Sequence, residues 1–575
     1  MSVTIETGRI GVTEGSPLWG INERWKVVLL LAAAMLVYAN TLVNGFAFDD
    51  GSYIFRNQAV TNPSIRALLA PTKFNNVMRP VTFATLALNL AVGGAHPFGY
   101  HLFNLLLHAA VVLLLYMVLR RLLGTLPEGG TVSLMAALLF AVHPIHTEAV
   151  ASIVGRSEVL AAGFLLAAWL LHLQDREIPS LLCLVLALMS KESAVAFLPL
   201  VLAGDFARGK FKPSGRYARI VGVSVAYLAL FWKVKGGRFG AFNIPFLDNP
   251  LAALPASLRI LNALRIAWKY AGLHIYPVRL SCDYSYNAIV LYANWRNGVF
   301  AAAATLLVMA LWSWALWNRR NEWFLAGAIY LGGFAATANL LVATGTIMGE
   351  RLAYLPSAGF CLLVALILIR FERNQRLLGF AVFVILTVTL AVRTVDRNSD
   401  WRDNLRLFST DVRVVPGSAK IHSNLGREYL RLGQLEAAQA ELRTALRIHP
   451  EFPEAEEFQG LVEALMGHGQ EARRSLEKAL SSIQSDDINY AFWKINLAAE
   501  LIQLGQSEDA LKLLNQVLAE SPGNARAWAN RAVIYYKRGE LTAARSDAEA
   551  ALRLEPSNGQ AQEVLNSVNL PSPGP

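Results

Sequence analysis

Long runs of Leu, Ala, Val and Phe fill the chain from Trp25 to Arg393, and no comparable run follows them. The whole chain of 575 residues is 54% hydrophobic and only 16% charged. This composition is too apolar for an ordinary soluble domain, so we expect a polytopic membrane protein. Residues 394–575 have the composition of a soluble helical segment, which places the boundary of the membrane part near Arg393.

The basic excess of the chain belongs to the membrane part. Residues 394–575 contain 20 Lys and Arg against 25 Asp and Glu, a net charge of −5. Since the whole chain carries +10, the first 393 residues carry +15. This charge suits cytoplasmic loops and lipid phosphates better than nucleic acid, for which the sequence has no basic stripe. The three cysteines, at positions 183, 282 and 361, show neither metal-ligand spacing nor a disulfide framework.

The apolar runs predict about eleven membrane crossings. Residues 25–44 are long enough to span a bilayer of ~30 Å and are expected to form an uncleaved first span. The basic residues favour a cytoplasmic N-terminus. Residues 260–280 are then a re-entrant or surface segment, whereas a true crossing there would invert one half of the topology. The further candidate spans lie near 100–119, 131–149, 157–173, 178–190, 192–204, 218–234, 298–317, 323–344, 353–370 and 377–393.

The soluble tail has a 34-residue period, which is the length of a tetratricopeptide helix–turn–helix unit. Four copies can be counted, although the third begins four residues late. Such units stack into a superhelix with a concave groove that typically holds a polypeptide. A spacer or dimerisation surface is the alternative. The small residues of the second helices that mark the four copies are Ala438, Ala472, Ala510 and Ala544.

Four groups of charged or polar residues interrupt the membrane part, and the predicted topology places all of them on the outer face. Charges at membrane depth are costly and usually serve a function. The paired carboxylates Asp49 and Asp50 follow the first span and could act as a general base or hold a cation. A helix cap is the structural alternative. The other groups are His143, His146 and Glu148 with Arg156, then Lys191 and Glu192, then Glu350 and Arg351.

The chemistry of these groups fits the transfer of a sugar or similar group from a lipid-phosphate donor. Arg presents a donor fork suited to phosphate oxygens, so Arg351 is the first phosphate-binding candidate. The two histidines could coordinate a metal, but a His-x-x-His pair is weakly specific and could equally bind substrate. Snorkelling at the interface is the alternative for the Lys–Glu and Glu–Arg pairs. No nucleotide-binding glycine loop is present, which disfavours a soluble nucleotide donor.

Together the motifs resemble the transmembrane and tetratricopeptide-repeat (TMTC-like) O-mannosyltransferase family, within the multi-span glycosyltransferase C superfamily. The resemblance rests on FAFDD, RPVTFATLALN, HPIHTEAVASIVGRSE, SKESA, GERLAYLPSAGF and the repeat tail, in the family's order. It implies transfer of mannose or another hexose from a polyprenyl-phosphate carrier to Ser/Thr hydroxyls of proteins on the non-cytoplasmic side. No cofactor is implied with certainty, and a divalent cation is possible.

The resemblance also implies roles for individual residues. Asp49, or secondly Asp50, would activate the acceptor hydroxyl. Arg156, Lys191 and Arg351 would bind the carrier phosphate. The residues that would shape the site are Arg79, His143, His146, Glu148, Glu192 and Glu350.

The match is loose around GRFGAF and CDYSY, so this resemblance does not fix mannose as the sugar. The short repeat tail suggests a bacterial inner-membrane protein with periplasmic repeats; an endoplasmic reticulum protein with lumenal repeats is the alternative. A non-catalytic membrane scaffold that displays the repeats to envelope proteins is the rival function.

The sequence therefore predicts an all-α protein with three parts. We expect a multi-span glycosyltransferase C-like helical bundle over residues 1–393, a linker over 394–418, and a tetratricopeptide-repeat solenoid over 419–570. Its expected partners are a polyprenyl-phosphate-linked sugar, a polypeptide acceptor bound by the repeats, and membrane lipid, without nucleic acid.

Overall fold

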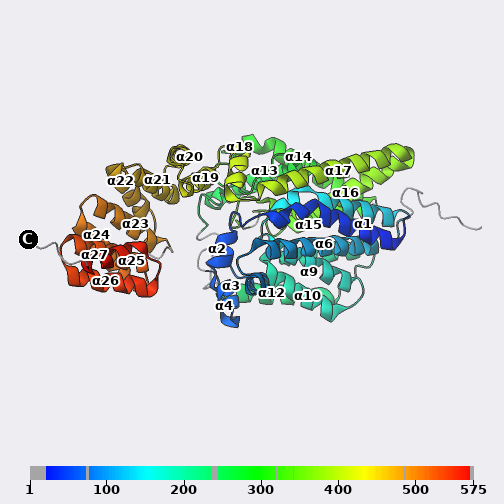
Figure 1. Cartoon of the computed structure of the whole chain (residues 1–575). Coiled ribbons are helices and arrows are strands. Elements are labelled where there is room, and N and C mark those ends of the chain that lie inside the picture. Colours follow the sequence, from blue (N-terminus) through cyan, green and yellow to red (C-terminus); the bar gives the residue numbers. More distant parts are fainter. Residues whose placement is uncertain are drawn as a thin grey trace, which may run out of the picture. The chain divides into compact units, whose positions relative to one another are not determined.

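The computed structural model describes residues 21–72, 77–234, 244–318, 321–340, 342–484, 487 and 489–569. Within these residues every regular element is a helix, which confirms the predicted all-α class (Figure 1). The chain divides into two compact units. The membrane unit comprises 1–285 and 289–414, and the repeat unit comprises 286–288 and 415–575. The GRFGAF motif lies outside the described residues.

Several helices of the membrane unit are long and apolar enough to cross a bilayer. In the described part of the chain there are five, or six if α7 and the bent segment after it form one span. The remaining predicted crossings fall on shorter helices, so the count of eleven stays a prediction. The five are α1 with its 3-10 extension (Glu23–Val43), α6 (Pro97–Leu122), α12 (Gly215–Val234), α14 with the turn before it (Trp295–Trp317) and α17 (Arg376–Asp400).

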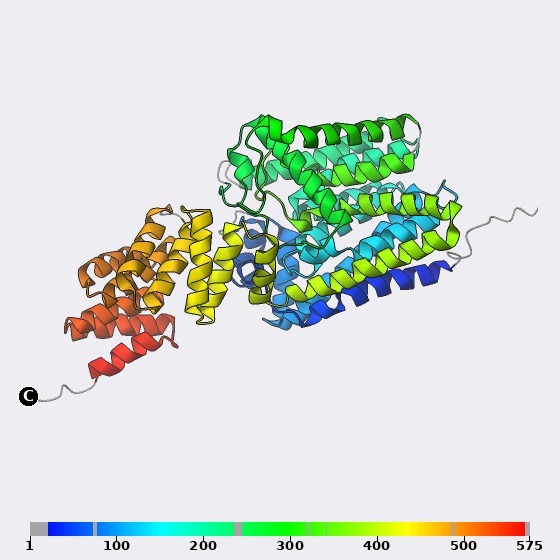
Figure 2. The same ribbon diagram turned by 90° about the horizontal axis from the view of Figure 1, so that it is seen from above.

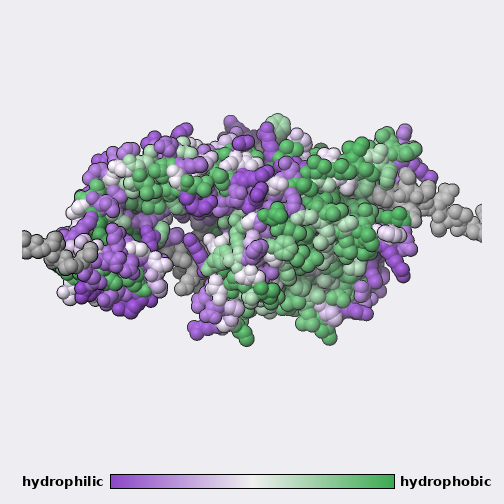
Figure 3. Space-filling model, in the orientation of Figure 1, coloured by the Kyte–Doolittle hydropathy of each residue, from purple (hydrophilic) through white to green (hydrophobic). Residues whose placement is uncertain are grey.

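The membrane unit is built around α7 (Gly129–Val142). Every residue of α7 from Val132 onward is buried, because α1, α6, α17 and α16 (Ser357–Asn374) all pack against it. A helix that is apolar all round is expected at the centre of such a bundle, whose long helices run side by side in Figure 2. Outer helices are apolar but exposed: only 6% of the α14 window is buried. Figure 3 shows the resulting apolar surface of this unit.

The polar motifs of the membrane unit lie in short turns that join the longer helices. Here the chain turns too sharply for a continuous helix, and backbone and side-chain polar groups become available to one another. The turns are α8 (Thr147–Val150), η3 (Pro144–His146), η4 (Glu192–Ala196) and η8 (Glu350–Ala353). The helices around them include α2 (Asp50–Phe55), α3 (Gln58–Thr61), α4 (Ile65–Leu69), α5 (Pro80–Gly93), α9 (Arg156–His172), α10 (Glu177–Ser190), α11 (Phe197–Ala207) and α15 (Asn321–Phe334).

The segment whose crossing was uncertain forms α13 (Ala256–Ile275). It is amphipathic: Ile266 and Tyr270 are buried, whereas Ile275 is 74% exposed. α13 carries too many polar residues to be among the candidate spans of the described chain. Its two-faced character is that of a helix lying along a surface with one side packed on protein.

The segment expected to be a linker, residues 394–418, is mostly helical. α17 continues through Asp400, and α18 (Asn404–Val414) follows it within the membrane unit. The drop in hydropathy after Arg393 marks the end of the apolar part of α17, and the helix continues beyond it. A polar helix end can extend beyond the apolar span when its side chains find partners, as Arg397 and Asp411 do here.

The predicted repeats form four pairs of antiparallel helices. Gly433, Gly467, Gly505 and Gly539 each lie two residues after the first helix of a pair and have positive φ angles of 71–82°. A glycine takes this left-handed conformation without a steric penalty. The four-residue insertion lies between α22 and α23. The pairs are α19 (Ala419–Arg431) with α20 (Leu435–Ile448), α21 (Pro453–Leu465) with α22 (Gly469–Ser481), α23 (Tyr490–Gln503) with α24 (Ser507–Glu520) and α25 (Ala525–Lys537) with α26 (Leu541–Leu554), followed by α27 (Gly559–Asn569).

Candidate functional site

Three ion pairs bring most of the predicted charged residues together. Arg79, just before α5, donates to both oxygens of Glu192 at 2.7 and 3.1 Å. Lys191 does not pair with its neighbour Glu192. Instead it forms a short ion pair with Glu158 of α9, and both side chains of that pair are more than nine-tenths buried.

The third pair joins α8 and η8. Glu148 is buried and forms a short ion pair with Arg351, and its other oxygen accepts the Arg351 main-chain amide at 2.8 Å. The Arg351 side chain remains 30% exposed. In the described part of the chain, Glu148 is the hydrogen-bond partner of Arg351 through Nη1 and the main chain, which leaves Nε and Nη2 available to a ligand.

The three pairs interact electrostatically with one another and with Asp49. The charges of Arg79, Glu192 and Arg351 act on Lys191. Those of Asp49 and Glu158 act on Arg351. Asp49 is only partly buried, at the start of α2. These elements are far apart in sequence. We call the group the charged cluster: Asp49, Arg79, Glu148, Glu158, Lys191, Glu192 and Arg351.

A small cavity of about 20 Å³ lies beside the charged cluster. Glu158 lines it, and Ser193, which follows Glu192 in η4, lies on its wall. Apolar side chains line the rest, among them Leu165, Leu352 and Leu355. This cavity has room for about one water molecule and is too small for a lipid chain.

Asp50 has a structural environment that differs from that of Asp49. It is buried, and its two oxygens accept from the main-chain amides of Ala47 and Val154, each at 3.0 Å. Burial raises the pKa of Asp50 to about 7. The side chain thereby ties the start of α2 to the turn before α9. Of the two candidate bases, Asp49 is the less buried.

Arg156, a predicted phosphate ligand, is buried among helices. Its guanidinium donates to Asn104 Oδ1 at 2.7 Å and to the carbonyl oxygens of Thr85 and Tyr100 at 3.1 and 3.0 Å. It also lies 4.5 Å from the Phe103 ring centre. All three guanidinium nitrogens are engaged, so Arg156 locks α5, α6 and α9 together. A phosphate could reach it only if this packing opened.

The two histidines are likewise buried. His143 Nε2 contacts the His274 carbonyl oxygen at 3.1 Å, and His146 Nε2 contacts Ser357 Oγ at 2.7 Å. His146 also packs on Tyr354, with ring centres 4.8 Å apart. Within the described ranges, no group of three or more His, Cys, Asp or Glu side chains is placed to hold a metal ion. The contacts of the two histidines join the end of α7 and η3 to α13 and α16.

Glu350 points away from the charged cluster, although its neighbour Arg351 belongs to it. Its Oε1 accepts from the Ser281 amide and the Tyr284 hydroxyl, both at 2.6 Å. Its Oε2 is buried and has no hydrogen-bond partner within the described chain. Burial raises the pKa of Glu350 to about 8.

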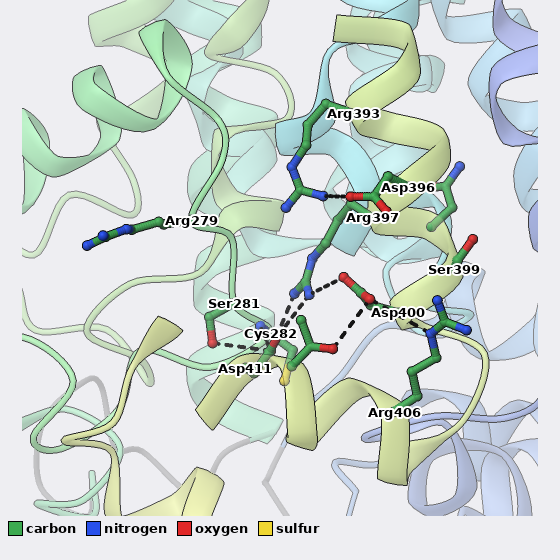
Figure 4. A network of polar contacts seen from close by, with 12 residues as sticks. Arg279, Ser281, Cys282, Arg393, Asp396, Arg397, Ser399, Asp400, Arg406 and Asp411 are labelled. Atoms are coloured by element: carbon green, nitrogen blue, oxygen red, sulfur yellow. Dashed lines mark hydrogen bonds and ion pairs between the residues drawn. The ribbon is translucent and has the colours of Figure 1, made fainter. Parts of the chain in front are cut away.

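A second polar network lies beyond Glu350, and the sequence reasoning missed it (Figure 4). Arg397 of α17 and Asp411 of α18 are fully buried and paired at 2.8 Å. Asp411 also accepts from the Cys282 amide at 2.6 Å, and Arg397 Nη1, which donates to Asp411, also donates to Asp400 at 3.1 Å. Both residues follow the last apolar run, within residues 394–418, which the sequence predicts to be a linker.

Comparisons with known proteins match both units. The tetratricopeptide repeat family matches residues 423–487 and 495–559, which confirms the predicted repeats. The protein O-mannosyl-transferase F38B6.6 of Caenorhabditis elegans is 30% identical over 74% of this chain and 63% of its own length. The mouse protein O-mannosyl-transferase TMTC3 is 27% identical over 93% of this chain and 64% of its own length. The chain thus spans less than two thirds of these relatives. Among solved structures, MamA matches 27% of this chain at 19% identity with a TM-score of 0.24.

Proposed function

Because the chain belongs to the TMTC-like family of transmembrane and tetratricopeptide-repeat O-mannosyltransferases, we propose that it is a membrane glycosyltransferase that acts on proteins. The donor is a polyprenyl-phosphate-linked sugar, mannose or another hexose, and the acceptors are Ser and Thr hydroxyls. The observation that carries this proposal is the charged cluster, in which Arg79, Lys191 and Arg351 are each held by a glutamate and Asp49 interacts electrostatically with Arg351.

The carrier phosphate binds among the cations of the charged cluster. The Nε and Nη2 of Arg351 donate to phosphate oxygens, while Arg79 and Lys191 stay paired with Glu192 and Glu158 beside it. Their carboxylate partners Glu148, Glu158 and Glu192 hold each cation in place before the ligand arrives. Preorganised donors of this kind stabilise the charge that develops on the leaving phosphate.

Asp49 orients the acceptor hydroxyl and takes its proton. The hydroxyl oxygen then attacks the anomeric carbon, the carbon–oxygen bond to phosphate breaks, and the polyprenyl phosphate leaves with the bonding electron pair. Phosphate is already a competent leaving group, so alignment and charge stabilisation are the main tasks of the protein. Asp50 and Arg156 keep the surrounding helices in register through their buried contacts.

The repeat unit binds the polypeptide acceptor. Stacked tetratricopeptide units present a concave groove that suits an extended polypeptide. The charged cluster and the repeats are assigned to the non-cytoplasmic side, which is the periplasm for a bacterial inner-membrane protein and the lumen for an endoplasmic reticulum protein. The basic residues of the membrane unit support this orientation through the positive-inside rule.

The test is a comparison of envelope or lumenal proteins by peptide mass spectrometry. Cells that lack this protein are complemented with wild type, Asp49→Asn or Asp396→Asn, the last as a control because the Asp396 side chain is 71% exposed and pairs with Arg393 on α17. We expect hexose on Ser/Thr peptides with wild type and the control, and its loss with Asp49→Asn at equal protein level. An unchanged profile in all strains would favour the non-catalytic scaffold.

A further inference from the structure

The hydroxyl of Tyr270 makes two hydrogen bonds to Gly349, in the loop that carries Arg351 of the charged cluster. It donates to the Gly349 carbonyl oxygen at 2.8 Å and accepts from the Gly349 amide at 3.0 Å. Tyr270 is only 4% exposed, so these main-chain groups have no solvent to replace the hydroxyl. The Gly349 carbonyl oxygen also accepts from the Leu352 amide at 3.1 Å, so loss of the hydroxyl would leave the buried Gly349 amide unpaired. An unpaired buried amide is costly, and the Tyr270 hydroxyl therefore helps to fix the position of Gly349.

The two residues after Gly349 are also held, each from a different side. Glu350 accepts from Ser281 and Tyr284, and the Arg351 amide donates to Glu148. The loop is thus fixed at three consecutive residues by three separate parts of the membrane unit. Arg351 follows Gly349 by two residues, so a rotation of the Gly349 peptide would displace its guanidinium.

Tyr270 also lies within the electrostatic field of the charged cluster. The charges of Glu148, Arg351 and Glu158 act on its hydroxyl. The ring packs on Phe334 of α15, with ring centres 4.6 Å apart. α13 therefore reaches the cluster with one side chain, while Ile275 at its end remains exposed.

We propose that Tyr270 is a positioning residue for carrier-phosphate recognition, and that it acts through Gly349 on the Arg351 guanidinium. This inference rests on the proposed function, because it assigns the use of Arg351 to the carrier phosphate. It predicts an effect on the carrier and none on the acceptor. A tyrosine with a purely structural role would affect both substrates through loss of folded protein.

The chain offers a matched control in Tyr330. Its ring packs on the same Phe334, at 5.3 Å, and its buried hydroxyl has no hydrogen-bond partner among the residues that the structure describes. Tyr330→Phe removes the same atom from the same neighbourhood without removing a hydrogen bond. The pair Tyr270→Phe and Tyr330→Phe therefore separates the two hydrogen bonds to Gly349 from general packing.

The experiment uses the full-length protein in lipid nanodiscs with mannosyl-phospho-polyprenol as the carrier and a Ser/Thr peptide as the acceptor. KM is measured for each substrate, and Tm for each variant. For Tyr270→Phe we expect a carrier KM at least about tenfold higher, which equals about 1.4 kcal/mol. We expect its peptide KM to stay within about twofold of wild type, and Tyr330→Phe to match wild type in all three measurements.

The outcomes distinguish this inference from the proposed function. If wild type transfers sugar and Tyr270→Phe behaves like Tyr330→Phe, the positioning role of Tyr270 is wrong and the proposed function stands. A Tyr270→Phe protein whose carrier and peptide KM rise together with a large fall in Tm would show a structural role and would also overturn the inference. If wild type neither transfers the sugar nor binds polyprenyl phosphate in native mass spectrometry, both proposals fail.

Discussion

Breaking the buried pair of Arg397 and Asp411 provides a direct test of how the end of α17 is held. Both side chains have 0% exposure, and Asp411 is also the acceptor for Cys282 and Ser281. Asp411→Asn keeps the shape but removes the charge, so Arg397 is left as a buried cation that has lost its fully buried partner and retains Asp400 and Glu350 nearby. Removing one partner of a buried pair typically costs about 3–5 kcal/mol.

This cost converts to a shift in thermal stability. A free energy of 1 kcal/mol shifts Tm by about 2–4 °C for 150–250 residues and by less for a larger unit. For the membrane unit we therefore expect a fall of roughly 3–10 °C, measured by thermal unfolding of the detergent-solubilised protein. The control is Asp396→Asn on the same helix, whose exposed pair with Arg393 contributes at most about 1 kcal/mol.

A double replacement decides whether the charge itself is responsible. Arg397→Met combined with Asp411→Leu removes both charges, and it should destabilise the protein less than the sum of the two single replacements. The reasoning is refuted if Asp411→Asn melts like Asp396→Asn. It is also refuted if the double variant is as unstable as the two single changes added together.

Two further predictions concern a buried carboxyl of the repeats and a buried arginine. Burial raises the pKa of Glu457 in α21 from 4.5 to about 7, so its proton stabilises the folded state below pH 4.5 and this contribution is lost as the pH rises through 7. Glu457→Gln should remove up to about 3 kcal/mol of the pH dependence of the unfolding free energy of α21. Hydrogen exchange of α21 at pH 5 and 8 measures it, and an unchanged difference between the two pH values would contradict the prediction. Arg156→Lys should lower Tm by several degrees, because the guanidinium loses contacts with Asn104, Thr85 and Tyr100. The carrier KM of the remaining folded protein should be unchanged. A raised carrier KM at unchanged Tm would show that Arg156 is a phosphate ligand.

The repeat unit could be predicted in detail, because its period fixes both the helices and their turns. The 34-residue spacing located the small residues where paired helices touch, and the structure buries Ala438, Ala472, Ala510 and Ala544 completely. Even the late third copy corresponds to a feature of the fold, the longer connection between α22 and α23. Periodicity is a local property of the chain, so it can be recognised in the sequence without knowledge of tertiary contacts.

The partners of the charged residues could not be predicted in the same way. Sequence neighbours suggested Lys191 with Glu192 and Glu350 with Arg351. In the structure Lys191 pairs with Glu158, and Arg351 pairs with Glu148. Adjacent residues in an extended or 3-10 turn point in different directions, so each charge finds its partner on another element. Only the packing of the helices decides which element that is.

The apolar pattern located the membrane part but not the exact ends of its helices. Hydropathy falls where α17 leaves the apolar region, and the helix nevertheless continues to Asp400. Arg397 is paired there with Asp411, which lies in the next helix. A hydropathy average over a window of neighbouring residues cannot detect such a partner.

The three residues Tyr286–Ala288 belong to the repeat unit, although the chain on both sides of them belongs to the membrane unit. The Asn287 amide donates to the Gly417 carbonyl oxygen at 3.0 Å, and the Ala419 amide donates to that of Tyr286 at 2.9 Å. The repeats are therefore not a module that evolution or an engineer could exchange by a single crossover at Val415. A transplanted array would need a matching tripeptide in a loop more than a hundred residues earlier in the chain, which ties the diversification of the repeats to that of the membrane unit.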